Sequence, residues 1–192
     1  MIMRSATNLY GKDWLLAAAQ ILIVAAKALL SIVLLGIGVG AVYILSGQDD
    51  IAAALAAGQS GVALIWANAG IILFLLGLIG LVGIGFMFVA LLGRIVNSVA
   101  AGDPFILANA QRLSRMAWLV LGAQILSLAL DLLGAWLSSL FPSGFGGENW
   151  HFSLDGDTYL SPEGILLALT LFILARVFRA GAEMRADLEG TV

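Results

Sequence analysis

Cysteine is absent from this sequence of 192 residues, and histidine occurs only once. Without cysteine there are no disulfides, no thiolate metal sites and no thiol catalysis. The one histidine, His151, has no partner for a zinc site or for acid–base catalysis, although it could respond to pH. No His, Cys or paired-acid constellation is present at the expected membrane surface, so the sequence predicts a protein that is not an enzyme and carries no cofactor.

Charged residues are also scarce. Charged residues make up 11% of the chain, whereas soluble proteins contain about 25%. Apolar residues make up 61%, against roughly 45 to 50% in soluble proteins. This composition excludes a soluble fold. It leaves room for one helical bundle in the lipid bilayer and for no separate soluble domain.

Lys and Arg are missing from two of the expected connections, one around Asp49 and Asp50 and one from Pro142 to Glu163. A chain that crosses a membrane four times would have both of these connections on the same side, and basic residues collect on the cytoplasmic side. The sequence therefore predicts cytoplasmic N- and C-termini. The basic residues that define this side are Arg4, Lys12, Arg94, Arg112, Arg115, Arg176, Arg179 and Arg185.

The predicted fold is all-α: a polytopic four-transmembrane-helix bundle that forms a single domain over residues 1–192. We expect spans at about 22–45, 64–92, 117–140 and 162–180, a cytoplasmic loop at 94–116, an outer loop at 142–161 and a cytoplasmic tail at 181–192. The first apolar run, 14–45, is too long for a cleaved signal peptide and includes a juxtamembrane helix continuous with the span. Ser161 as N-cap, Pro162 and Glu163 mark the start of the fourth span.

Glycines are frequent in the first two spans, where they permit close approach between membrane helices. Gly36 and Gly40 form a small-xxx-small pair on the first span. The second span carries Gly70, Gly77, Gly80, Gly83 and Gly85.

The cytoplasmic loop holds a turn at Gly102, Asp103 and Pro104, followed by a stretch with apolar residues at near-helical spacing. This stretch predicts a cytoplasmic amphipathic helix. Such a helix could lie on the membrane surface, held to anionic lipid by Arg112 and Arg115, or could form a docking surface for a cytoplasmic protein.

An Asp-Gly pair at Asp155 and Gly156 lies between β-compatible residues and is typical of a hairpin, so a small extracytoplasmic β-hairpin at 151–159 is a further expectation. The acidic residues of this region lack the spacing of a calcium loop. We therefore expect them to be solvated.

Two polar stripes lie within the apolar runs. Gln124, Ser127 and Asp131 share one face of the third span, and Lys27 and Ser31 share one face of the first. An acid inside a membrane suggests a site for a proton, a cation or a partner charge. This pattern supports an alternative function, a small transporter or channel subunit, in which Asp131→Asn would abolish flux.

Asp131 also has a purely structural interpretation, in which it is protonated or bonded to Ser31, Asn68 or Gln124 and holds the bundle together. A direct pair with Lys27 is a third alternative. The two residues differ in expected depth by roughly 15 Å at 1.5 Å per residue, which argues against this pair.

Two segments, VNSVAAGDPFILANAQRLSR at 96–115 and LARVFRAGAEMRADLEGTV at 174–192, resemble the bacterial membrane family catalogued as domain of unknown function 2975. The resemblance covers about a fifth of the chain. Gly190 departs from it, because the family usually ends in Leu-Thr-Val. The matching positions are Gly102, Pro104, Phe105, Asn109, Arg112, Leu113, Phe178, Arg179, Gly181, Thr191 and Val192.

That family has no established chemistry, and its genes often lie beside a small helix-turn-helix regulator. The resemblance therefore implies a protein of the bacterial inner membrane, in contact with the lipid bilayer, that serves as a regulatory or sensing partner of a cytoplasmic transcription regulator. Nothing in the sequence predicts direct nucleic-acid binding, and self-association into a homo-oligomer stays open. The predicted partner contacts are Asp103, Phe105, Asn109, Arg112, Arg115, Arg179 and Arg185.

Overall fold

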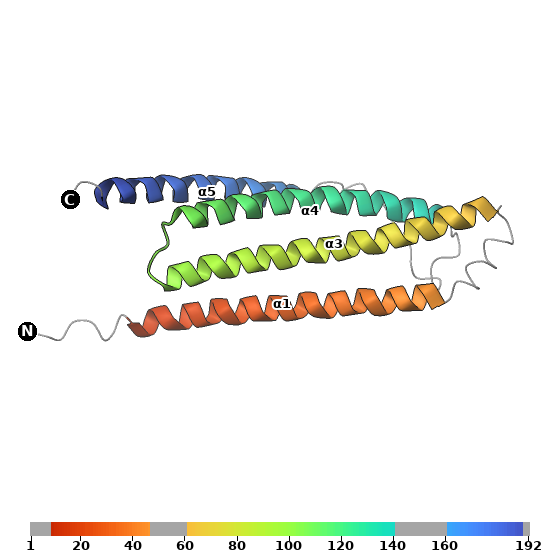
Figure 1. The fold of residues 1–192 in the computed structure, drawn as a ribbon, viewed down its shortest axis with the longest axis horizontal. Coiled ribbons are helices and arrows are strands. Elements are labelled where there is room, and N and C mark those ends of the chain that lie inside the picture. The colour runs from red at the N-terminus through yellow and green to blue at the C-terminus, as the bar shows by residue number, and fades with distance from the viewer. Residues whose placement is uncertain (1–8, 47–60, 141–160, 190–192) are drawn as a thin grey trace, which may run out of the picture. The chain divides into compact units, whose positions relative to one another are not determined.

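The computed structural model describes residues 9–46, 61–140 and 161–189, and these residues form an all-α bundle of four long helices (Figure 1). The helices are α1 (Leu9–Ser46), α3 (Gly61–Ala100), α4 (Leu107–Leu140) and α5 (Pro162–Glu189). The hairpin expected at 151–159, together with Thr191 and Val192, lies outside the described residues.

Each helix contains a stretch long and apolar enough to cross a membrane. These stretches are Leu16–Ile44, Ile65–Ala100, Leu107–Ser139 and Pro162–Leu188. A span needs about 20 residues at 1.5 Å rise to cross a hydrocarbon core of about 30 Å. The chain is therefore a multi-pass membrane protein with four candidate spans.

The segment after the turn continues directly into the third span. The sequence predicts a cytoplasmic amphipathic helix before this span, and α4 is one uninterrupted helix that starts at Leu107 and includes both stretches. The apolar side chains of its first turns, Ala110, Leu113 and Met116, are buried. The amphipathic stripe therefore packs against the protein and continues the span, because no helix-breaking residue separates the two.

The chain forms two compact units, each of which contains parts of all four helices. Unit 1 comprises Met1–Ser31, Gly85–Val120 and Leu166–Val192, and unit 2 comprises Ile32–Ile84 and Leu121–Ile165. Every Lys and Arg in the described ranges belongs to unit 1, as the one-sided charge pattern predicts.

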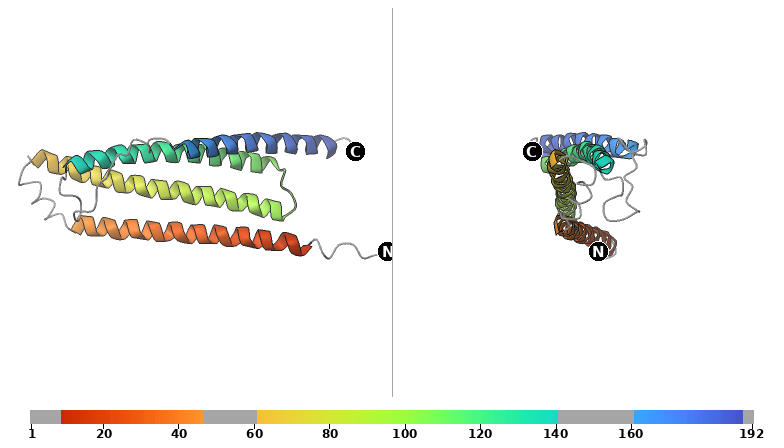
Figure 2. Two further views of the ribbon diagram at one scale, coloured as in Figure 1. Left: turned by 180° about the vertical axis from the view of Figure 1, so that it is seen from behind. Right: turned by 90° about the vertical axis from the view of Figure 1, so that its right-hand side faces the viewer.

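Unit 1 has an apolar core to which α3, α4 and α5 all contribute. Leu91 of α3, Met116 of α4 and Leu171 of α5 are buried in it. α5 lies alongside the first part of α4 in both ribbon views (Figures 1 and 2). Two side chains of α1 lie opposite glycines of α3: Leu30 faces Gly85, and Ile23 faces Gly93.

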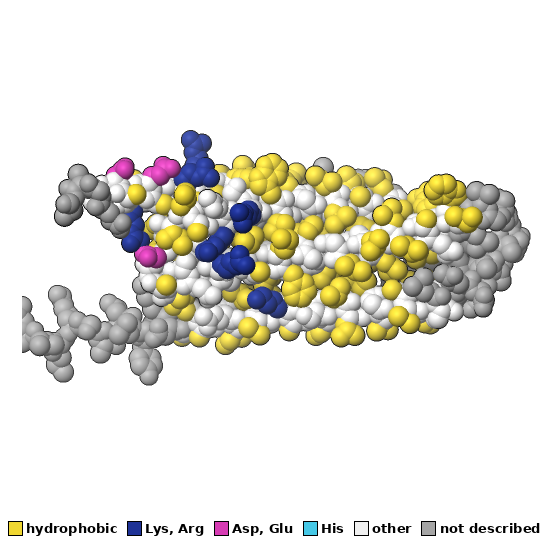
Figure 3. Space-filling model, in the orientation of Figure 1, with side chains coloured by type: hydrophobic (Ala, Val, Ile, Leu, Met, Phe, Trp, Pro, Cys, Tyr) yellow, Lys and Arg dark blue, Asp and Glu magenta, His cyan; other side chains and the backbone are white. Residues whose placement is uncertain are grey.

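Charged side chains of unit 1 gather near the α3–α4 turn. Figure 3 shows Lys and Arg in a band on one face, with Asp and Glu nearer the end of the molecule where the turn lies. Basic side chains prefer the boundary between hydrocarbon and water. We use the name basic band for six Lys and Arg residues of unit 1: Lys27, Arg94, Arg112, Arg115, Arg176 and Arg179.

In unit 2, glycines of α3 let α4 approach closely. A Cβ atom built on Gly70 would lie 2.6 Å from the Trp136 ring, and one on Gly77 would lie 2.5 Å from Leu130 Cδ2. The glycines of α1 behave differently. At Gly36, Gly38 and Gly40 a Cβ atom would meet nothing within 4 Å, so these residues do not bring α1 against another described part of the chain.

Candidate functional site at the α3–α4 turn and the end of α5

The turn after α3 is a Schellman motif. The Gly102 N–H donates to Val99 O at 3.0 Å and the Asp103 N–H donates to Ser98 O at 3.1 Å, the two bonds that define this helix end. Gly102 has a φ of +86°, a conformation that glycine adopts without steric cost. The glycine of the Gly-Asp-Pro turn is therefore required by the backbone.

We expect Gly102→Ala to lower the free energy of unfolding by about 1 kcal/mol, because a Cβ atom is disfavoured at positive φ. Gly102→Asn is the matched control. Asparagine tolerates positive φ better than alanine, so this variant should lose less stability. Unfolding of the purified protein in mixed detergent micelles measures both changes. Equal losses for the two variants would contradict the role of φ.

Asn109 holds the turn from inside. Its side chain is fully buried. Nδ2 donates to Ser98 Oγ at 2.6 Å and to Pro104 O at 2.9 Å, and the Ser98 hydroxyl donates in turn to Ile95 O at 2.7 Å. Asn109 thus joins the end of α3, the turn and the start of α4.

The side-chain oxygen of Asn109, Oδ1, accepts a hydrogen bond from Arg112. Arg112 donates from one guanidinium nitrogen to Asn109 Oδ1 at 2.7 Å and to Arg94 O at 3.2 Å. The second bond meets a carbonyl in α3, eighteen residues earlier in the chain. Arg112 therefore clamps α4 to α3, and charge-assisted bonds of this kind are stronger than neutral ones.

The end of α5 packs on this turn. The rings of Phe105 and Phe178 lie 5.2 Å apart between centroids, in a tilted arrangement. A Cβ atom on Gly181 would lie 2.8 Å from the Phe105 ring, so only glycine lets that ring lie against α5. Arg185 of α5 forms a salt bridge with Asp103 of the turn.

The predicted partner contacts thus come together at one end of unit 1, but they differ in exposure. Asp103, Phe105, Arg115, Arg179 and Arg185 are exposed, whereas Arg112 is half-buried and Asn109 is buried. The last two side chains are engaged inside the protein. Ser98 belongs to the same network and was missed, because a serine near a helix end carries no specific signal in one sequence.

Beyond the basic band, several apolar side chains of this end are exposed. Met184 and Leu188 of α5 are 62% and 73% exposed, and Phe105 and Leu107 are 45% and 51% exposed. They lie among charged residues such as Asp103, Arg185 and Asp187. We call Phe105, Leu107, Met184 and Leu188 the apolar end patch.

The predicted polar stripes lie elsewhere. Gln124, Ser127 and Asp131 are in unit 2, while Lys27 and Ser31 are in unit 1. The Ser127 hydroxyl donates to Gln124 O at 3.0 Å and the Ser31 hydroxyl to Lys27 O at 2.9 Å, so each serine bonds to its own helix. Asp131 is half-buried and Lys27 is exposed.

Gln124 contacts the start of α5. As predicted, Ser161 caps this helix: the Gly164 N–H donates to Ser161 Oγ at 3.2 Å, and Glu163 lies in the first turn. Ser161 Oγ lies 3.5 Å from Gln124 Oε1, at the outer limit for a hydrogen bond. Gln124 is 9% exposed, and its Nε2 has no partner among the described residues.

Comparisons with known protein families, with curated proteins and with solved structures found no match to this chain. The chain is an integral membrane protein with four candidate spans. Its α3–α4 turn and the end of α5 are joined by the Arg185–Asp103 salt bridge and the Phe105–Phe178 contact, in the unit that carries the basic charge.

Proposed function

We propose that this protein is a non-enzymatic membrane partner of a cytoplasmic regulator, and that the end formed by the α3–α4 turn and the end of α5 is the docking surface. The apolar end patch is the observation that carries this proposal. Hydrophobic side chains that face lipid need no further explanation, but this patch lies past the basic band, among charges. Clustered exposed apolar residues in water commonly mark interaction sites.

The internal network supports a preorganised surface. Asn109 and Arg112 link the turn to both neighbouring helices, and the Phe105–Phe178 contact adds α5. A surface held in this way loses little conformational entropy when a partner binds. The positive-inside rule favours a cytoplasmic location for this surface.

The resemblance to the family of domain of unknown function 2975 supports a particular class of partner. Among the residues that carry it, Phe105 of the turn packs against Phe178 and Gly181 of α5. Asn109 of α4 bonds to Pro104 of the turn. The family's neighbouring genes suggest a small helix-turn-helix regulator. The membrane protein would hold or release it and would not bind DNA itself.

Removal of two exposed charges that are both predicted partner contacts tests the proposal. We expect Arg115→Gln combined with Arg185→Gln to lower the amount of the regulator encoded beside the gene that the purified protein retains, by roughly tenfold. The fold should survive, since an exposed ion pair such as Arg185–Asp103 contributes about 0 to 1 kcal/mol. The measurement is retention of the regulator on the immobilised full-length protein in detergent.

Lys27→Gln combined with Arg94→Gln is the matched control, because it removes the same charge from two exposed residues that are not predicted partner contacts, and it should leave retention unchanged. If the wild-type protein retained no regulator, or if both double variants lost it equally, the docking proposal would be wrong.

The rival function is a small transporter or channel subunit that uses Asp131. Buried Gln124, whose Nε2 has no hydrogen-bond partner among the described residues, favours it. The close packing of α3 on α4 counts against it. Gly77 faces Leu130, just before Asp131 in α4, and Gly70 faces Trp136, just after it. A flux in reconstituted vesicles that Asp131→Asn abolished would favour the rival.

A further inference from the structure

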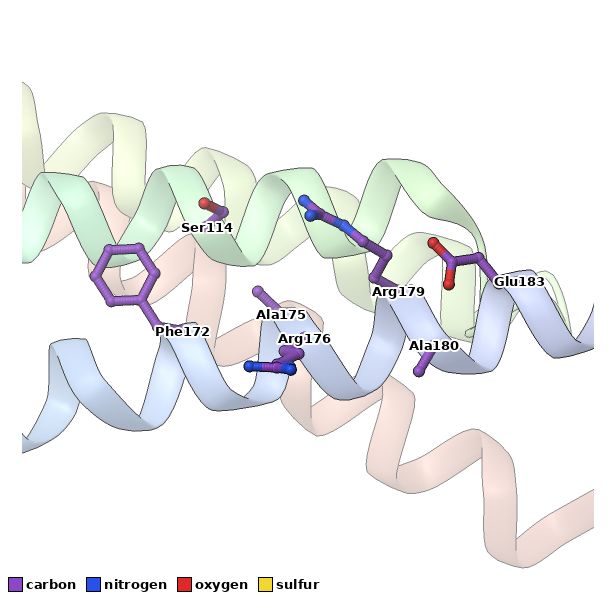
Figure 4. Close-up of a pocket in the computed structure, with 7 residues that line it drawn as sticks. All are labelled: Ser114, Phe172, Ala175, Arg176, Arg179, Ala180 and Glu183. Carbon is purple, nitrogen blue, oxygen red and sulfur yellow. The ribbon is translucent and has the colours of Figure 1, made fainter.

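A groove with a volume of about 610 Å³ runs between α4 and α5 in unit 1 (Figure 4). Ser114 lines it from α4, and the side chains of α5 supply the rest. Figure 4 shows the guanidinium of Arg179 reaching toward α4 and Ser114. The main lining residues are Ser114, Phe172, Ala175, Arg176, Arg179 and Glu183.

We propose that this groove binds the headgroup phosphodiester of an anionic phospholipid through Arg176 and Arg179, with an acyl chain beside Phe172. The proposal is independent of the docking surface, because the groove lies within the basic band and not at the apolar end patch.

The charge of the groove favours an anionic ligand. Arg176 and Arg179 are exposed, and neither makes a hydrogen bond or an ion pair with another described residue. Arg112 and Arg185, in contrast, are engaged by Asn109 and Asp103. Guanidinium groups match the geometry of phosphate oxygens, so two available arginines in one groove favour a phosphate ligand.

The side chains that α5 contributes to the groove change in character along the helix. Phe172, Arg176, Arg179 and Glu183 follow one another at steps of three or four residues, so they lie on one face of the helix. Apolar, basic and acidic groups therefore succeed one another over about 16 Å at 1.5 Å per residue. A phospholipid has the same order, with its chains toward the apolar end and its phosphate at the interface.

An aromatic pair that includes Phe172 lies at the apolar end of the groove. The rings of Trp118 and Phe172 lie 5.5 Å apart between centroids and meet edge-on, and Trp118 is 65% exposed. Tryptophan is enriched at the level of lipid headgroups. An acidic peptide would use the arginines but would gain nothing from this apolar end, so the surrounding lipid is the better occupant.

Glu183 gives the groove a selectivity. Two arginines and one glutamate leave one net positive charge, which matches a phosphodiester with one negative charge. A phosphate monoester carries additional negative charge, which the Glu183 carboxylate repels. We therefore expect phosphatidylglycerol to bind better than phosphatidic acid, and Glu183→Gln to reduce that difference.

The test uses the full-length protein in nanodiscs of phosphatidylcholine mixed with phosphatidylglycerol, with retained lipid identified by native mass spectrometry. We expect Arg176→Gln combined with Arg179→Gln to lower retention of phosphatidylglycerol, relative to phosphatidylcholine, by at least about tenfold. The control, Lys27→Gln with Arg94→Gln, removes the same charge outside the groove and should lose much less. Equal losses in the two variants would overturn the site in favour of non-specific attraction.

Two further arms keep the result interpretable. Arg176→Lys with Arg179→Lys keeps the charge and should restore part of the retention, which a merely misfolded variant would not show. An excess of inorganic phosphate should leave phosphatidylglycerol bound, whereas its displacement by phosphate would overturn the lipid as occupant. Displacement by a soluble acidic peptide would likewise assign the groove to a protein partner.

Discussion

Replacing Asn109 with alanine should lower the free energy of unfolding by about 3 kcal/mol, the sum of lost buried hydrogen bonds and a small cavity. The side chain is fully buried and bonded to three different residues. Pro104 O would lose the donor that Asn109 provides. Ser98 and Arg112 each keep a second bond, to Ile95 O and Arg94 O, which limits the damage.

Equilibrium unfolding in mixed detergent micelles, followed by far-ultraviolet circular dichroism, measures this loss. Gln111→Ala is the control, because Gln111 is exposed on the same helix and its replacement should change stability by less than about 0.5 kcal/mol. Asn109→Asp separates the effect of hydrogen bonding from that of volume. Aspartate keeps the shape of the side chain but places an oxygen, in place of the donating Nδ2, opposite the acceptors Ser98 Oγ and Pro104 O. An Asn109→Ala variant as stable as Gln111→Ala would show that the network does not hold the turn.

Gly77→Leu should destabilise the protein by about 2 kcal/mol, because the new side chain collides with α4. A Cβ atom alone would lie 2.5 Å from Leu130 Cδ2 and 3.2 Å from Leu130 Cγ. Leucine has a higher helix propensity than glycine, by somewhat less than about 1 kcal/mol, and this gain offsets part of the loss. The same unfolding measurement applies.

Gly83→Leu is the matched control on the same helix, since a Cβ atom there meets nothing within 4 Å, and it should be neutral or slightly stabilising. A double-mutant cycle sharpens the test. Leu130→Ala should cost less in a Gly77→Ala background than alone, because the truncated side chain makes room for the new methyl group. Strict additivity would mean that the two positions are not in contact.

Much of the fold could be predicted because its signals are local. The start of α5 illustrates this, since Ser161, Pro162 and Glu163 act within one helical turn. The extent of α4 could not be predicted in the same way. Polar residues between Leu107 and Met116 indicate a surface helix, yet Ala110 and Leu113 are buried by packing against other helices.

The glycines show the same limit. Gly36 and Gly77 look alike in sequence, as small residues in apolar runs. Only Gly77 has a facing side chain, Leu130, within contact distance. Whether a small residue brings two helices together depends on what stands opposite, which a single sequence does not contain.

The candidate site divides along similar lines. The sequence predicts that Asp103, Phe105 and Asn109 belong together, because they are close in the chain. It does not distinguish side chains that hold the turn from those that face outward. Asn109 was predicted to contact a partner; in the structure its side chain is buried and bonds to Ser98, Pro104 and Arg112.

The sequence by itself determined the membrane location, the four spans and the clustering of basic residues, because partitioning into lipid is a sum over residues along the chain. The tertiary structure alone decided which polar groups are satisfied internally and which remain available. Arg112 and Arg185 are engaged, while Arg176 and Arg179 line an open groove. That difference arises from the packing of α5 against α4 and the turn, a relation between distant segments that no local pattern specifies.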